Sequence, residues 1–313
     1  MDILSDVISA MRAGRPGIVR AEWHSPWGRR FPDDPGTAGF IVILQGSCWL
    51  LSDDADPVPI SPGDVLFFPH GDGCMLADSP GTPLDDSPTG DLLADTEVFT
   101  TISFGEDTGV APTVMLCGGY TLNPSWTHPL LRSLPATIHI PARVGRHPGL
   151  RAAVDILGTE IDGGNIGADA IVSVALDMLL LYILRAWFEE VPAHQTGSGW
   201  AAALADPAVN AALNAIHQDP ARSWTVQDLA GVARLSRAAF SRRFSSLTGQ
   251  PPMAYLTWWR LTVAADMLRT SDASLDSVAA RVGYGSEFAF ANAFKRQYGV
   301  APGRYRRRSR GTG

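Results

Sequence analysis

The sequence is poor in cysteine and has no long uninterrupted apolar run. Among 313 residues the only cysteines are Cys48, Cys74 and Cys117, and no two form a C-x-x-C pair. This excludes a disulfide scaffold and indicates a reducing compartment. The most apolar stretch, residues 174–184, contains Asp177 and is shorter than the roughly 20 residues that span a bilayer. Residues 1–12 lack the basic start of a signal peptide, so we expect a cytoplasmic protein without a membrane partner.

Positive charge is also scarce overall, because the net charge is −7. A nucleic-acid partner would be unexpected if that charge were spread evenly. Residues 1–199 carry 10 basic and 25 acidic side chains, a balance of −15, whereas residues 200–313 carry 15 and 7, a balance of +8. The basic part has the charge expected for binding phosphate. The alternative is an ordinary solvated charged surface.

Short apolar runs separated by Pro, Gly and Asp fill the segment from residue 17 to residue 116. Such runs predict strands, and many short strands favour a barrel or sandwich. A short helix is expected over residues 1–13 and an exposed loop over residues 78–95. The predicted strands cover residues 40–44, 48–51, 65–68, 98–104 and 113–117.

The periodicity becomes helical after residue 149. Leu150, Val154, Leu157 and Ile161 recur at three- and four-residue steps, which predicts an amphipathic helix. A second helix over residues 168–190 is apolar around most of its circumference and needs cover on more than one side. Its own barrel or a second subunit could provide that cover. A small, polar, Gly-containing linker follows, which we place at residues 192–204.

The last ninety residues contain an internal repeat, whose copies begin at Thr225 and Ser274. Leu229-Ala230 corresponds to Val278-Ala279, and Ser236 to Ser286. The offset is 49 residues before this serine and 50 after it, so the second turn is one residue longer. The later matches pair Phe240, Phe244, Gly249, Pro252 and Tyr255 with Phe290, Phe294, Gly299, Pro302 and Tyr305.

Each copy has the parts of a helix-turn-helix unit. Thr225 can cap a first helix, and Ser236 and Ser286 can cap the second helices. The paired phenylalanines lie at i and i+4, so they share the face that packs on the core. The opposite face is free to reach DNA. It carries Arg237, Ala238, Ser241, Arg242 and Ser245 in the first copy, and Glu287, Phe288, Ala291, Asn292 and Lys295 in the second.

A long helix is expected over residues 252–269, with Trp258, Leu261, Ala265 and Leu268 on its buried stripe. A rigid connector of this kind would hold the two second helices about 34 Å apart, in successive major grooves of one DNA face.

These features resemble the DNA-binding domain of the AraC/XylS family of transcription regulators, over about residues 205–310. The most specific match is the ending Gly283-Tyr-Gly-Ser…Phe294-Lys-Arg-Gln-Tyr-Gly-Val-Ala-Pro-Gly-Arg-Tyr-Arg. The resemblance implies that Ala238, Ser241 and Arg242 read bases in one unit, and Glu287, Phe288, Ala291 and Asn292 in the other. Arg242 can pair bidentately with guanine. Phosphate contacts are expected from Arg237, Arg243, Lys295 and Arg296, with non-specific attraction from the tail 304–310.

Residues 61–74 resemble the second motif of cupin barrels, which runs Gly, five residues, Pro-x-Gly, two residues, His. Gly63, Pro69 and Gly71 match, but Cys74 occupies the histidine position. No histidine lies between His24 and His70, so the first motif lacks its His-x-His. A cupin-type metalloenzyme with an appended DNA-binding tail is the alternative function, and the missing ligands argue against it.

The barrel has a second set of candidate residues, for sensing. Cys74 and Cys117, with His24 or His70, could bind a soft metal or undergo oxidation. The alternative is that the cysteines are inert and buried. Trp23, Trp27, Trp49, Phe67 and Phe68 could line an effector pocket or form the core.

The sequence therefore predicts an α+β multidomain protein that is not an enzyme. A cupin-like sensor barrel (residues 1–146) and a helical dimerisation segment (147–191) are followed by a linker (192–204). An all-α domain with two helix-turn-helix units completes the chain (205–310). The predicted function is a sequence-specific transcription regulator, activator or repressor, controlled by a signal in the barrel. Its expected partners are double-stranded DNA, RNA polymerase and a second copy of the chain, without a resident cofactor.

Overall fold

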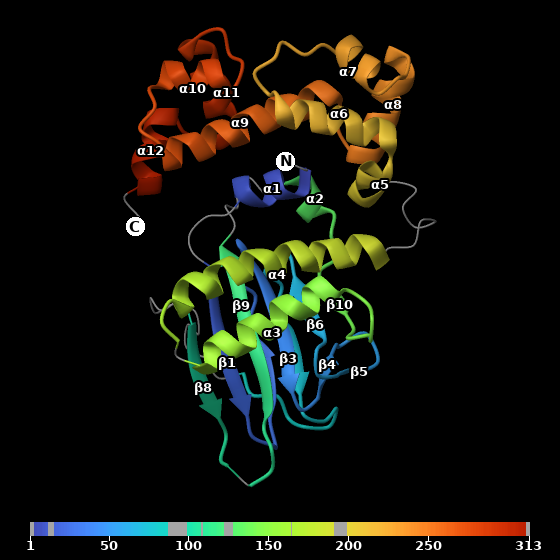
Figure 1. Ribbon diagram of the computed structural model, residues 1–313, viewed down its shortest axis with the longest axis vertical. Coiled ribbons are helices and arrows are strands. Elements are labelled where there is room, and N and C mark those ends of the chain that lie inside the picture. Colours follow the sequence, from blue (N-terminus) through green and yellow to red (C-terminus); the bar gives the residue numbers. More distant parts are fainter. Residues whose placement is uncertain are drawn as a thin grey trace. The chain divides into compact units, whose positions relative to one another are not determined.

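The computed structural model describes residues 3–11, 16–86, 99–107, 109–121, 128–163, 165–190 and 199–310 (Figure 1). The chain divides into two compact units. The barrel unit is built from the segments 12–127 and 134–190. The helical unit is built from residues 1–11, 128–133 and 191–313. Each unit is described separately.

Two sheets make up the barrel unit. The six-stranded sheet has the order β10-β6-β3-β9-β1-β8, and the four-stranded sheet has the order β2-β7-β4-β5. Neighbouring strands are antiparallel except β1 and β8, which are parallel. The strands are β1 (Gly17–Trp23), β2 (Gly28–Phe31), β3 (Thr37–Gln45), β4 (Cys48–Leu51), β5 (Val58–Ile60), β6 (Val65–Phe68), β7 (Cys74–Ala77), β8 (Phe99–Phe104), β9 (Thr113–Thr121) and β10 (Ile138–Ile140).

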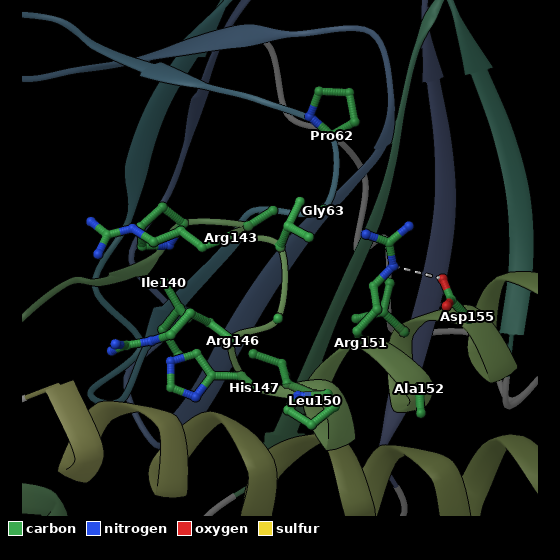
Figure 2. Close-up of a pocket in the computed structure, with 16 residues that line it drawn as sticks. Pro62, Gly63, Ile140, Arg143, Arg146, His147, Leu150, Arg151, Ala152 and Asp155 are labelled. Carbon is green, nitrogen blue, oxygen red and sulfur yellow. Dashed lines mark hydrogen bonds and ion pairs between the residues drawn. The ribbon is translucent and has the colours of Figure 1, made fainter.

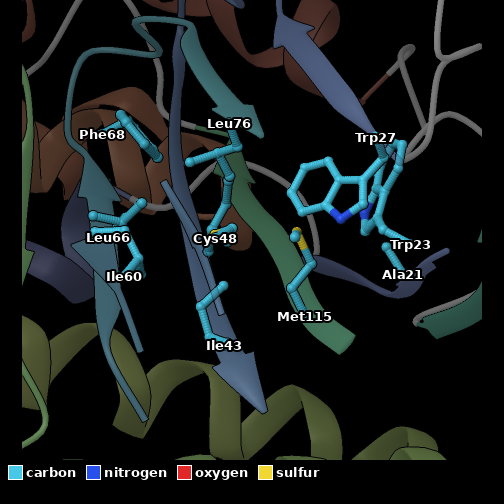
Figure 3. Close-up of a cluster of buried hydrophobic side chains, with 11 residues drawn as sticks. Ala21, Trp23, Trp27, Ile43, Cys48, Ile60, Leu66, Phe68, Leu76 and Met115 are labelled. Carbon is cyan, nitrogen blue, oxygen red and sulfur yellow. The ribbon is translucent and has the colours of Figure 1, made fainter. Parts of the chain in front are cut away.

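The core of the barrel unit is made by side chains from both sheets (Figure 3). Trp23, Trp27, Phe67 and Phe68 are buried and belong to the core, whereas Trp49 is only half-buried. The indole of Trp23 stacks on Phe104 with ring centroids 4.1 Å apart. All five predicted strands are present among the described residues, although residue 98 of the run 98–104 lies outside them. Two strands are longer than predicted, because β3 begins at Thr37 and β9 continues to Thr121.

Two helices complete this unit, α3 (Pro148–Gly163) and α4 (Ala168–Glu190), and they match the predicted pair. They pack against each other, and α4 also contacts β10. By length and composition α4 could cross a membrane. It is instead covered on part of its surface, where residues such as Leu176, Leu179 and Ile183 are fully buried. Ile171 and Val174 remain exposed.

The helical unit is all-α among its described residues. Its longest helix, α9, runs beneath both repeated pairs of short helices (Figure 1). The elements are α1 (Ile3–Met11), α2 (Pro129–Arg132), α5 (Trp200–Ala205), α6 (Pro207–Gln218), α7 (Val226–Val232), α8 (Arg237–Thr248), α9 (Pro252–Thr270), α10 (Leu275–Arg281), α11 (Glu287–Tyr298) and α12 (Pro302–Arg310).

The compact units cut across the predicted domain boundaries. The prediction assigned residues 1–146 to the barrel, but α1 and residues 128–133 belong to the helical unit. Sequence order could not reveal this, because the contacts of α1 with α6 and α9 join segments some two hundred residues apart. The predicted linker 192–204 also overlaps α5; residues 192–198 lie outside the described part of the chain.

Candidate nucleic-acid interface

The first repeated pair of helices is defined by side-chain caps. Thr225 accepts a hydrogen bond from the backbone N–H of Asp228, and the Asp228 carboxylate accepts one from the N–H of Thr225. These reciprocal bonds satisfy backbone groups that the first turn of a helix leaves unpaired. Hydrogen bonds from Thr225 also hold the pKa of Asp228 below its usual range. Ser236 caps α8 through the N–H of Ala239, which fixes where the second helix begins.

The second pair has the same construction with a different turn. Ser274 caps α10, and Ser286 caps α11. The turn before each second helix needs one residue with positive φ, which is Arg234 (φ 54°) in the first copy and Gly283 (φ 77°) in the second. A Cβ on Gly283 would lie 2.5 Å from the carbonyl oxygen of Ala221, so only glycine fits. The extra residue of the second turn lies after this position, between Gly283 and the capping Ser286.

The paired phenylalanines hold each second helix on its core. Phe240 and Phe244 on α8 are fully buried, with ring centroids 5.5 Å apart, and Phe290 and Phe294 on α11 repeat that spacing. Phe244 lies 6.0 Å from the ring of Tyr255 on α9. The predicted inward face of both helices is therefore correct, and the opposite faces point away from the core.

The long connector α9 has 19 residues, which corresponds to about 28 Å at 1.5 Å per residue. Its buried residues include Leu261, Ala265 and Leu268, as predicted, but Trp259 is buried rather than Trp258. Trp259 is needed on that side because its ring stacks on His217 of α6, with centroids 3.9 Å apart. Arg260, the next residue on α9, holds the loop between α6 and α7, because its guanidinium donates to the carbonyls of Pro220 and Arg222.

The predicted reading residues lie where DNA could reach them. Arg237, Ala238 and Arg242 are exposed on α8, and Ser241 is half-buried beside them. On α11, Glu287, Phe288 and Asn292 are exposed and Ala291 is half-buried. The Phe288 side chain is 78% exposed, which is unusual for a phenylalanine. The exposed side chains of both helices therefore do not belong to the core of the helical unit.

The candidate phosphate contacts divide into free and engaged groups. Arg237, Lys295 and Arg296 are exposed and form no ion pair with another described residue. Arg243 is different, because it pairs with the carboxylate of Asp206, which also caps α6. In the tail, Arg306 donates to the carbonyl of Ala273 ahead of α10. Arg243 and Arg306 thus already make contacts within the helical unit.

The candidate sensing residues lie in the barrel unit. Cys74 and Cys117 pack against the same buried cluster, which contains Cys48. Burial, the largest cause, raises the pKa of the Cys117 and Cys48 thiols to about 12 and also raises that of Cys74. These groups are therefore neutral thiols at pH 7, and a thiolate pair is disfavoured. His70 bonds the carbonyl oxygen of Leu134 at 3.0 Å, and no cluster of three potential metal ligands occurs among the described residues.

Two grooves mark the surface of the barrel unit. One, of about 640 Å³, has Phe31, Leu50 and Cys74 among its lining residues, and these three also pack against the buried cluster. The other, of about 580 Å³, lies between the loop 141–147 and the start of α3 (Figure 2). Its arginines are mostly engaged, since Arg151 pairs with Asp155 and Arg146 with Glu190.

A polar cluster in the core of the helical unit had no signal in the sequence. It joins Asp6 of α1, His128 ahead of α2, His217 of α6 and Tyr255 of α9. Periodicity could not have found it, because each residue lies singly on its own element. The residues next to His128 in the sequence likewise give no indication of its partners.

Comparison with known proteins agrees with this architecture. Residues 2–189 match the Cupin family, and residues 229–308 match the Helix-turn-helix domain family. A putative AraC-like transcription regulator of Streptomyces lividans is 34% identical over 310 residues, covering 98% of each chain. The RCS-specific HTH-type transcriptional activator RclR of Escherichia coli is 33% identical, covering 94% of this chain and 91% of its own.

Among solved structures, the DNA-binding domain of AdpA in complex with a target DNA is 38% identical. The match covers 34% of this chain and 96% of that one, with a TM-score of 0.33. The relatives named above are transcription regulators and not enzymes. The chain therefore belongs to the AraC family of DNA-binding transcription regulators, with an N-terminal cupin domain and a C-terminal helix-turn-helix domain.

Proposed function

We propose that α8 and α11 read two successive major grooves of one operator. The supporting observation is the pair of exposed faces opposite the buried phenylalanines. Arg242 would pair with a guanine on the first side, while Phe288 and Asn292 would contact a thymine methyl and an adenine on the second. Ala238, Ser241, Glu287 and Ala291 would border these contacts. Arg237, Lys295 and Arg296 would bind phosphates.

The test is a binding selection with the full-length protein on random duplexes. Two conserved half-sites about one helical turn apart would support simultaneous reading. A single half-site of five or six base pairs would contradict it, because one unit would then carry all the specificity. Repeating the selection with Arg242→Ala and Asn292→Ala assigns each half-site to its helix.

We further propose that the barrel unit senses an effector and so controls transcription from the cytoplasm. The groove lined in part by Phe31, Leu50 and Cys74 borders the buried cluster, which supports a small-molecule effector. The thiols remain a second candidate sensor, but their raised pKa requires an oxidant that attacks neutral thiols. Oxidation that alters DNA affinity in the wild type but not in Cys74→Ser would favour the thiols. An unchanged affinity would favour the groove.

Dimerisation and contact with RNA polymerase belong to the same proposal. Ile156 of α3 and Ile171 and Val174 of α4 are exposed apolar residues on neighbouring helices, a pattern that suits a second copy of the chain. Sedimentation of Val174→Glu should give a monomer, whereas Ile166→Glu, on an exposed turn, should behave as wild type. A wild-type monomer at micromolar concentration would remove the dimer.

A further inference from the structure

The helical unit contains two short segments that the chain order places among the barrel strands. The helix α1 precedes β1, and residues 128–133 lie between β9 and β10. Both are packed into the helical unit: Ile3, Val7 and Ile8 of α1 and Leu130 and Leu131 of α2 are buried. These two segments, hereafter the docked segments, are held against α6 and α9 by the polar cluster.

The hydrogen bonds of the cluster allow the position of each proton to be assigned in turn, starting from His128. The backbone N–H of Leu130 donates to Nδ1 of His128 at 2.8 Å, so this nitrogen carries no proton. The proton of a neutral His128 ring must then lie on Nε2, which is 3.2 Å from the Tyr255 hydroxyl and donates to it. Both nitrogens of His128 are therefore committed.

The same logic continues to the other histidine. The Tyr255 hydroxyl accepts from His128, so its own proton is directed to Nε2 of His217, 2.6 Å away. Nδ1 of His217 then carries that ring's proton and donates to the Asp6 carboxylate at 3.2 Å. One arrangement of protons satisfies every bond, with both histidines neutral.

An additional proton has no place in this arrangement. Protonated Nδ1 of His128 would face the N–H of Leu130, and protonated Nε2 of His217 would face the Tyr255 hydroxyl proton. Water is excluded, since His128 is fully buried between Trp200, Tyr255 and Trp258, and His217 stacks on Trp259. Among the residues that the structure describes, the acid bonded to these rings is Asp6 of α1, while α6 and α9 contribute His217 and Tyr255.

We propose that this cluster is a proton-sensitive lock, which releases the docked segments from the helical unit under mild acid and thereby weakens DNA binding. The inference goes beyond the proposed function, because it needs no effector in the barrel. Release of the docked segments would affect DNA binding through α9, because this helix joins the two helix-turn-helix units and carries Tyr255. The contacts of α1 are with α6 and α9 rather than with the exposed faces of α8 and α11. Release therefore loosens the connector and lowers affinity for a two-part site.

The direction of the pH effect follows from burial. Desolvation lowers the pKa of His128 well below 6.5, and His217 adds to this; desolvation also lowers the pKa of His217, although Asp6 opposes it. Below pH 6.5 the released histidines bind protons more readily than the docked ones. Docking is thus fully stable above that pH and weakens as the pH falls, up to about tenfold per pH unit for each histidine.

The test measures DNA affinity and segment docking together, in the full-length protein. The probe is a duplex selected at pH 7.5, and anisotropy is recorded at pH 7.5, 6.5 and 5.5 at constant ionic strength. We expect at least a tenfold loss of affinity between pH 6.5 and 5.5. Hydrogen exchange, corrected for its intrinsic pH dependence, should rise at pH 5.5 in residues 3–11 and 128–133 before it rises in α8 and α11.

Variants of the two histidines distinguish titration of this cluster from titration of other groups in the protein. His128→Asn keeps an acceptor for Leu130, His217→Gln keeps an acceptor for Tyr255, and the double variant should flatten the pH profile. His139→Gln, in the barrel unit, is the matched control and should keep the wild-type profile. Unchanged exchange of the docked segments in the wild type at pH 5.5 would overturn the proposal, even if the double variant does not fold. A flattened profile in His139→Gln would also overturn it.

Discussion

The two helix-turn-helix units share one design but differ in how they are braced and in what they expose. The first is braced by α5 and α6, and its exposed face is basic, with Arg237 and Arg242. The second is braced by α12, where Tyr305 packs on Phe294, and its exposed face carries Phe288 and Asn292. The repeat thus conserves what holds each helix in place, while the solvent-facing residues diverge. Such divergence fits two units that read different bases.

Replacing the buried phenylalanines should lower the unfolding free energy of both units more than the other substitutions considered below. Phe244→Ala and Phe294→Ala each remove a fully buried ring, which should cost about 3–5 kcal/mol of unfolding free energy. Chemical denaturation followed by circular dichroism measures this. Equal losses would show that the units are equivalent in their cores. A loss below about 1 kcal/mol in either variant would mean that the ring is not packed as described.

The turns that precede α8 and α11 should differ in how strongly a substitution destabilises them. Gly283→Ala places a Cβ 2.5 Å from the Ala221 carbonyl oxygen in a left-handed conformation, and we expect a loss of at least about 2 kcal/mol. Arg234→Gly, at the corresponding position, relieves left-handed strain while adding chain entropy, so its effect should stay within about 1 kcal/mol. Thermal denaturation compares the two. The interpretation of the turns fails if Gly283→Ala is the milder change.

Substitutions on the exposed faces of α8 and α11 should change base specificity in different half-sites. Arg242→Ala should cost about 1–3 kcal/mol of binding free energy on the selected duplex and relax specificity at one position of its half-site. Asn292→Ala should do the same in the other half-site. Anisotropy on duplexes substituted base by base measures both effects. An equal loss on every duplex would place these side chains on phosphates instead.

The smallest effects are expected from the engaged arginines. Arg243 pairs with Asp206 while remaining half exposed, so Arg243→Ala should change stability by no more than about 1 kcal/mol. The salt dependence of DNA binding should not change, in contrast to Arg237→Ala, which should lower the slope by about one. Titration of binding against salt distinguishes them. A reduced slope in Arg243→Ala would return this residue to the phosphate contacts.

The repeat, the caps and the apolar periodicity of the C-terminal part are short-range patterns, and they predicted α8 and α11 and which face of each helix is buried. The strands at 40–44, 48–51, 65–68 and 113–117 were visible for the same reason. By contrast, β1, β2, β5, β7 and β10 were missed; β7 was missed although Cys74-Met-Leu-Ala77 is an apolar run. The hydrogen bonds of Arg243 and Arg306 within the helical unit were missed because their partners, Asp206 and Ala273, lie 37 and 33 residues away.

The sequence alone therefore determined the family, the two-part organisation and the faces of α8 and α11, since helix periodicity and capping are set within a few residues. Only the tertiary structure decided that α1 and residues 128–133 belong to the helical unit. It also decided that His128, Tyr255, His217 and Asp6 form one chain of hydrogen bonds, and that desolvation raises the pKa of all three thiols. The reason is physical: burial and long-range partners set the pKa and the hydrogen bonds of a side chain, and neither is encoded in its neighbours along the chain.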